Sequence, residues 1–272
     1  MTDPVFTVAL GAELVLVLGG LALLWRLKFA RDARQSAAPV RLAPWDAPAS
    51  EFLLYLWLII AGAFCLLYAA GFVAPHLPFE AEERLNLTGV SAHLGALLGL
   101  VIFWRVFARR SAAPAPMAPG PGIFLSGFAT FLISIPLVYA VAFLWQGGLQ
   151  LCGIDPEPQD LIAVLRNSNS TLFQGLMIVA ATIVVPIAEE SLFRGGLFRY
   201  ARGRVPRWVA LTVPALLFGA MHANLSGFLP LSVLGLIFAL AYERTGRLGT
   251  SIVAHGLFNL HSVVMLFTGV GT

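Results

Sequence analysis

Long apolar runs constrain this chain more than any other feature. A membrane-crossing helix needs roughly 20 mainly apolar residues, and eight segments qualify, of which the sixth and seventh are short. They cover residues 4–25, 52–74, 88–108, 123–146, 171–199, 207–222, 228–243 and 249–268. Only helices or closed barrels satisfy backbone polar groups in lipid, and the runs lack the period-2 alternation of barrel strands. We therefore predict an all-α fold, a polytopic membrane bundle of about eight transmembrane helices.

The composition agrees with this class. Of 272 residues, 58% are hydrophobic and only 11% are charged, against about 25% charged residues in soluble domains. The net charge of +3 favours contact with lipid headgroups in the bilayer over nucleic-acid binding. Cys65 and Cys152 have no metal-ligand spacing, and we expect no disulfide. The first run lacks the basic start of a signal peptide, so we expect it to be retained.

Basic residues alternate between the loops. All of the 17 Lys and Arg residues except Arg84 and Arg166 lie in or beside the odd-numbered loops, while the even-numbered loops are acidic. Because short cytoplasmic loops hold an excess of Lys and Arg, this pattern predicts that both termini lie outside. We expect an integral protein of a bacterial inner membrane.

Ionisable side chains interrupt the later apolar runs. One charge at mid-membrane depth costs roughly 2.5–3.5 kcal/mol on insertion scales, so such residues are expected to pair or to serve a function. The fifth run contains Glu189, Glu190 and Arg194. A four-residue offset places Glu190 and Arg194 on one helix face as an ion pair, whereas Glu189 points about 100° away. Glu189 is therefore the candidate general base, with a purely structural network as the alternative.

Further polar residues follow in the last runs. His222 ends the sixth run, and His255 and Asn259 stand four residues apart in the eighth. An imidazole and a carboxamide on one face could donate hydrogen bonds to a single oxygen and stabilise an oxyanion. The alternative for each histidine alone is an interhelical hydrogen bond.

Other positions favour structural roles. We predict a bundle-facing or interfacial Glu13, and interfacial positions for His93 and His261 near the outer ends of their runs. Gly95 and Gly99 form a small-xxx-small pattern that favours a helix contact.

Three motifs occur in order on separate runs: Glu-Glu-x-x-x-Arg, Phe-x-x-x-His and His-x-x-x-Asn. Together they span Glu189 to Asn259, about a quarter of the chain. This arrangement resembles the CPBP family of intramembrane proteases, which includes the CAAX prenyl endopeptidase of the Rce1 type and bacterial Abi proteins. The resemblance predicts that residues 123–272 form the catalytic bundle. Residues 1–122 are then an N-terminal region of three spans with proline-rich cytoplasmic linkers at 36–50 and 111–122.

The resemblance implies an endopeptidase that hydrolyses a peptide bond in a membrane-associated protein or peptide. Glu189 and His222 would bind and activate a water molecule, while His255 and Asn259 would hold the oxyanion. The residues that would orient and pack this site are Glu190, Arg194 and Phe218.

Three alternatives remain beside this interpretation: a zinc-dependent mechanism, a transporter and a non-catalytic adaptor. The family is often labelled metalloprotease, and Glu189, His222 and His255 could bind Zn²⁺. We favour a metal-free mechanism, because the chain has no His-Glu-x-x-His motif and Asn259 is a better oxyanion donor than zinc ligand. A proton-coupled transporter could also use buried Glu, His and Arg residues, although no internal repeat is found. A non-catalytic adaptor is a third possibility.

Overall fold

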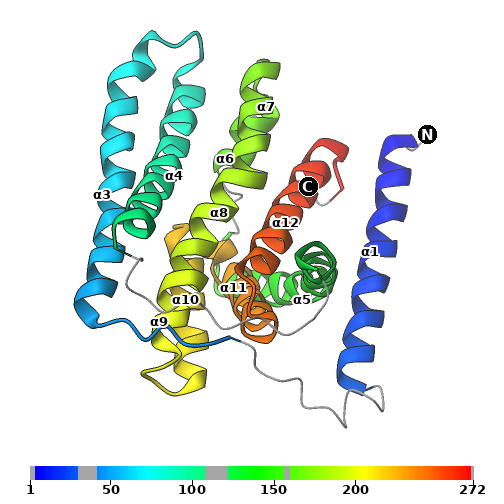
Figure 1. Ribbon diagram of the computed structural model, residues 1–272. Coiled ribbons are helices and arrows are strands. Elements are labelled where there is room, and N and C mark those ends of the chain that lie inside the picture. The colour runs from blue at the N-terminus through cyan, green and yellow to red at the C-terminus, as the bar shows by residue number, and fades with distance from the viewer. Residues whose placement is uncertain (1–3, 30–41, 108–121, 156–159, 271–272) are drawn as a thin grey trace. The chain divides into compact units, whose positions relative to one another are not determined.

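The computed structural model describes residues 4–29, 42–107, 122–155 and 160–270 (Figure 1). Every regular element in these ranges is helical, which confirms the all-α prediction. Residues 36–41 and 111–121 of the predicted linkers lie outside the described ranges. The helices are α1 (Pro4–Phe29), α3 (Ala49–Val73), η1 (Ala74–His76), α4 (Ala81–Val106), α5 (Ile123–Leu151), α6 (Asp160–Asn167), α7 (Thr171–Val179), η3 (Ala180–Val184), α8 (Val185–Glu190), η4 (Ser191–Phe198), α9 (Arg199–Ala201), α10 (Arg207–Met221), α11 (Leu225–Thr245) and α12 (Leu248–Thr268).

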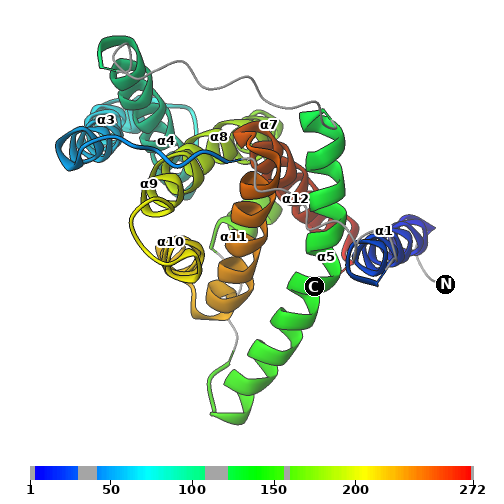
Figure 2. The same ribbon diagram turned by 60° about the horizontal axis from the view of Figure 1, so that its bottom comes forward.

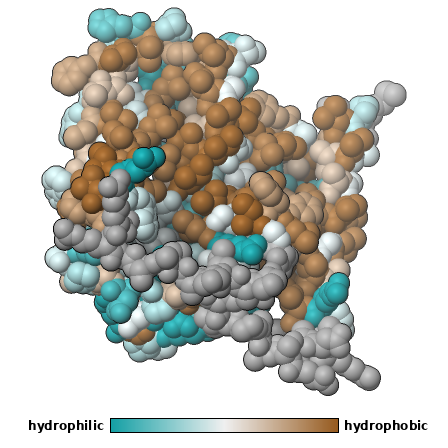
Figure 3. All heavy atoms as spheres, in the orientation of Figure 1, coloured by the Kyte–Doolittle hydropathy of each residue, from teal (hydrophilic) through white to brown (hydrophobic). Residues whose placement is uncertain are grey.

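Seven helical stretches in the described residues are long and apolar enough to cross a membrane. They are Pro4–Leu27, Ala49–His76, Ala81–Val106, Ile123–Leu151, Thr171–Ala201, Leu225–Thr245 and Leu248–Thr268. The apolar helix α10 is shorter, as predicted, whereas α11 is longer than the run that predicted it. Hydrophobic side chains cover much of the face shown in Figure 3. The chain is thus a polytopic integral membrane protein.

The described helices form two compact units. One contains α1, α5, α11, α12 and most of α10, and the other contains α3, α4 and the helices from α6 to α9. Each unit takes helices from both sides of residue 122. The assignment of residues 123–272 as the catalytic bundle stays a prediction.

Helix α5 is the centre of the first unit, where it packs against α1, α11 and α12 (Figure 2). Apolar side chains of three helices form its core: Phe131, Ile135, Val138, Leu234, Phe238 and Ala254. Gly20 lets α1 approach closely, because a Cβ there would lie 2.1 Å from the carbonyl oxygen of Leu132. Small residues therefore permit the contact that the apolar surfaces favour.

A buried polar pair joins α1 to α12 in the same unit. His261 Nε2 lies 2.6 Å from Glu13 Oε2, and both residues are buried. Pairing offsets the cost of placing a carboxylate among apolar helices. Glu13 therefore faces the helix bundle, which is one of the two positions predicted for it. His261, which the sequence predicts at the interface, packs inside the unit against α1, and its depth in the membrane stays a prediction.

The second unit is built on the α3–α4 hairpin, whose helices lie side by side (Figure 1). A Cβ on Gly95 would lie 2.0 Å from the carbonyl oxygen of Gly62, and one on Gly99 would lie 2.1 Å from that of Leu58. The predicted glycine contact is therefore confirmed. Beside it, a core cluster comprises Trp45, Ala47, Tyr55, Ile59 and Phe103.

We predict that Gly95→Leu destabilises the protein, because the larger side chain must separate the α3 and α4 backbones. The free energy of unfolding should fall by roughly 1–3 kcal/mol, a typical cost of overpacking. The measurement is the thermal unfolding midpoint in detergent. Gly71→Leu in α3 is the matched control, because nothing lies within 4 Å of a Cβ at that position. Equal midpoints for the two variants would contradict the close packing.

Candidate active site

The residues of the first motif lie on one continuous helical stretch from Thr171 to Ala201. Two π-helical segments, η3 and η4, flank the short helix α8 that carries Glu189 and Glu190. Pro186 has no N–H, so it cannot donate the backbone hydrogen bond of a regular α-helix. The N–H of the preceding residue, Val185, bonds to the carbonyl oxygen of Ala180, five residues earlier. Such π-helical turns are rare and occur frequently at functional sites.

The predicted ion pair forms within this stretch. Arg194 Nη1 donates to Glu190 Oε1 at 2.8 Å, with both side chains almost fully buried. A buried charge without a partner is costly, and a hydrogen-bonded partner of opposite charge offsets part of that cost. The pair therefore stabilises this face of the helix.

Tyr55 of α3 holds the π-helical segment η4. Its hydroxyl donates to the carbonyl oxygen of Ser191 at 2.6 Å. Its ring lies against Gly196, where a Cβ would come within 2.5 Å of Tyr55 Cε1. Tyr55 could not be predicted as a site residue, because an aromatic residue in an apolar run does not indicate its partner, which is 136 residues away.

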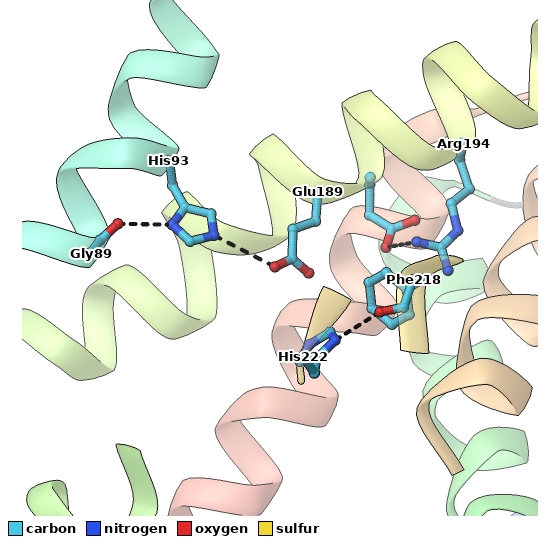
Figure 4. A network of polar contacts seen from close by, with 7 residues as sticks. Gly89, His93, Glu189, Arg194, Phe218 and His222 are labelled. Carbon is cyan, nitrogen blue, oxygen red and sulfur yellow. Dashed lines mark hydrogen bonds and ion pairs between the residues drawn. The ribbon is translucent and has the colours of Figure 1, made fainter. Parts of the chain in front are cut away.

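Glu189 faces α4, where its carboxylate meets His93 (Figure 4). His93 Nε2 lies 3.5 Å from Glu189 Oε1, and His93 Nδ1 lies 3.4 Å from the carbonyl oxygen of Gly89. The interfacial prediction for His93 is wrong, because α4 begins at Ala81 and His93 stands at its middle. A capping box between Glu80 and Glu83 starts this helix well before the apolar run at residue 88.

The second motif belongs to the first unit and lies at the end of α10. His222 follows the last residue of α10, and its Nδ1 lies 2.8 Å from the carbonyl oxygen of Phe218 (Figure 4). Because a carbonyl only accepts hydrogen bonds, Nδ1 carries the proton and Nε2 is the basic nitrogen. The next residue, Ala223, has φ 49°, a left-handed conformation that is uncommon for alanine. Such strain is often found at functional sites.

Phe218 packs against both histidines of this unit. Its ring centroid lies 5.0 Å from that of His222 and 5.8 Å from that of His255, in edge-on arrangements. On the other side, His255 packs against Phe238 at 5.4 Å. The buried ring of Phe218 thus connects the second and third motifs.

The third motif lies on α12, which is anchored at its start. Ser251 Oγ donates to the carbonyl oxygen of Phe238 at 2.9 Å, and Thr250 Oγ1 lies 2.9 Å from Ser126 Oγ of α5. These bonds fix the helix that carries buried His255 and half-buried Asn259, one turn apart. Both side chains therefore project from one face of α12.

The structure thus assembles two groups of predicted site residues. Glu189, Glu190 and Arg194 belong to the second unit; Phe218, His222, His255 and Asn259 belong to the first. A joint role of the two groups stays a prediction from the motifs.

The segment that carries the three motifs is similar to a known protein family. Residues 171–261 match the family model of the type II CAAX prenyl endopeptidase Rce1-like proteins, and this segment contains every predicted site residue. The predicted resemblance to CAAX-type membrane proteases is therefore confirmed over this third of the chain. No solved structure matches the chain.

Individual relatives are bacterial. The chain is 36% identical over 113 residues (42% of this chain and 45% of the relative) to "Putative membrane peptidase YdiL" of Bacillus subtilis. It is 33% identical over 142 residues (50% and 53%) to "Membrane-embedded CAAX protease MroQ" of Staphylococcus aureus. It is also 27% identical over 212 residues (76% and 93%) to an uncharacterized 24.3 kDa protein of Escherichia coli. The chain spans about half the length of the first two relatives.

Proposed function

We propose that this protein is an intramembrane endopeptidase of the CAAX type, which hydrolyses a peptide bond in a membrane-associated protein or peptide. The observation that carries the proposal is the complete set of three motifs inside the segment that matches the Rce1-like family. The names of two relatives, a membrane peptidase and a membrane-embedded CAAX protease, support it.

In this proposal Glu189 and His222 activate the attacking water. Glu189 is buried in an apolar helix, and a carboxylate positioned beside a water can take its proton as a general base. The hydrogen bond from His222 Nδ1 to Phe218 orients the ring and leaves Nε2 as the atom that binds the water. The ion pair of Glu190 and Arg194 orients the helix that carries Glu189.

His255 and Asn259 would stabilise the oxyanion of the tetrahedral intermediate. They stand one turn apart on a helix that is anchored at its start, so their donors can be held in place before the reaction begins. Donors that are preorganised where water is scarce stabilise developing charge strongly.

We predict that Glu189→Gln and His222→Ala each lower kcat by roughly 10²- to 10⁴-fold, as expected for loss of a proton-accepting group. Asn259→Ala should lower kcat by about 10²- to 10³-fold, as removal of one oxyanion donor does. The measurement uses the full chain in detergent with an internally quenched peptide that ends in a farnesylated CAAX sequence. Exposed Glu82 provides the control Glu82→Gln, which should retain activity. Full activity of the Glu189 and His222 variants would refute these assignments.

We also propose that the reaction needs no metal. The donor types of Glu189, His222 and His255 fit zinc, which would polarise a bound water; among the described residues, however, no three His, Cys, Asp or Glu side chains come together as a metal site. Asn259 also suits an oxyanion hole better than a zinc site, and a general-base mechanism already uses each of the four residues. We predict that 1,10-phenanthroline leaves cleavage unchanged. Inactivation by the chelator, with recovery after Zn²⁺ addition, would establish the metalloprotease alternative.

The alternation of basic and acidic loops supports both termini outside in the inner membrane. Two exposed native cysteines report on this orientation: Cys152 directly after α5 and Cys65 within α3. A membrane-impermeant maleimide should label Cys152 in intact spheroplasts and leave Cys65, which faces lipid, unlabelled. Cys152→Ser is the control. Labelling of Cys152 only after lysis would reverse the orientation.

A further inference from the structure

His93 is an ionisable residue that none of the three motifs contains. It stands at the middle of α4, a helix that crosses the membrane by length and composition. An ionisable side chain at this depth is costly unless it pairs or has a function. Its imidazole points from α4 toward the Glu189 carboxylate in Figure 4.

The two faces of α4 have different contacts. Gly95 and Gly99 pack against α3, and the 3.6-residue period places His93 on nearly the opposite side of the helix. That side faces α8, the helix of Glu189, and α4 and α8 pack against each other within the unit. The close α3–α4 contact therefore sets the rotation of α4 that directs His93 to Glu189.

The proton positions follow from the contacts of the ring. Nδ1 lies 3.4 Å from the Gly89 carbonyl oxygen, which can only accept, so Nδ1 carries a proton. Nε2 then faces Glu189 Oε1 at 3.5 Å; with a proton on Nε2, the ring donates to an ionised carboxylate. Together with the contact of Nδ1 to Gly89, this contact restrains the rotation of the Glu189 carboxylate.

We propose that His93 is a positioning residue for Glu189: its imidazole holds the carboxylate in the orientation from which it accepts a proton from water. The inference rests on the proposed endopeptidase function. In the reaction, the water oxygen bonds to the carbonyl carbon while one water proton passes to Glu189. That proton then moves to the amide nitrogen as the C–N bond breaks, and His93 retains its own protons throughout.

Two substitutions separate hydrogen bonding from packing. His93→Leu fills the space without a donor, whereas His93→Gln retains an N–H near the position of Nε2. We expect His93→Leu to lower kcat for the farnesylated CAAX peptide by roughly 10- to 100-fold, as loss of a supporting contact does. KM should change by less than about twofold, because a residue that positions Glu189 acts on the chemical step rather than on substrate binding. His93→Gln should recover most of the lost kcat.

A second readout needs no substrate. Dicyclohexylcarbodiimide modifies carboxyl groups that are protonated in apolar surroundings, and peptide mass spectrometry locates the product. Because the His93 ring contacts the Glu189 carboxylate, His93→Leu should accelerate modification of Glu189. Modification of Glu190, which Arg194 binds, should stay unchanged. His76→Leu, a substitution of an exposed histidine between α3 and α4, is the matched control for both readouts.

The outcomes distinguish failure of this inference from failure of the proposed function. Wild-type kcat and wild-type Glu189 modification in His93→Leu would overturn the role of His93, while an inactive Glu189→Gln would uphold the proposed function. A loss in His93→Gln as large as that in His93→Leu would overturn positioning by a hydrogen bond. If the wild-type protein leaves the peptide intact, the proposed function fails for this substrate, and carbodiimide modification still tests the contact. An unchanged unfolding midpoint verifies that each variant is folded.

Discussion

The buried ion pair between Glu190 and Arg194 is the interaction on which the rest of the motif-bearing helix depends. Each charge alone costs roughly 2.5–3.5 kcal/mol at mid-membrane depth, so the helix is compatible with lipid only if the two groups remain together. Because both side chains of the pair are almost fully buried, the pair must face the protein interior, and this requirement restricts how the helix can rotate. With Glu190 and Arg194 turned inward, the adjacent Glu189 is directed to α4, and the hydroxyl of Tyr55 holds the π-helical segment that follows.

Two histidines make the same local contact with the backbone. His93 and His222 each place Nδ1 beside the carbonyl oxygen four residues earlier, that of Gly89 and that of Phe218. A carbonyl oxygen has a second lone pair beyond the one its backbone partner uses, so a helix can orient an imidazole without losing its own hydrogen bonds. This contact selects the tautomer of the imidazole and directs Nε2 away from the helix. In one unit Nε2 meets a carboxylate; in the other, the aromatic edge of Phe218 supports the ring.

Local periodicity and the demands of lipid explain what could be predicted. The helical segments, the Glu190–Arg194 pair and the contact at Gly95 and Gly99 follow from apolar run length and from offsets of about one turn. The position of His93 was wrongly predicted, and the partners of His93 and His261 could not be predicted. Their partners, Glu189 and Glu13, lie far away in the sequence, and the start of α4 depends on a capping box rather than on hydropathy.

The sequence by itself determined that the chain crosses a membrane as helices and that its ionisable residues gather in three ordered motifs resembling those of CAAX-type proteases. The tertiary structure alone decided which neighbour each polar side chain meets within its unit: His93 for Glu189, Tyr55 for the π-helical segment, and Phe218 for two histidines. The physical reason is that apolar side chains are stable both against lipid and against protein, so they do not determine which way a helix faces. The rotation of each helix depends instead on a few glycine contacts and hydrogen bonds between distant residues.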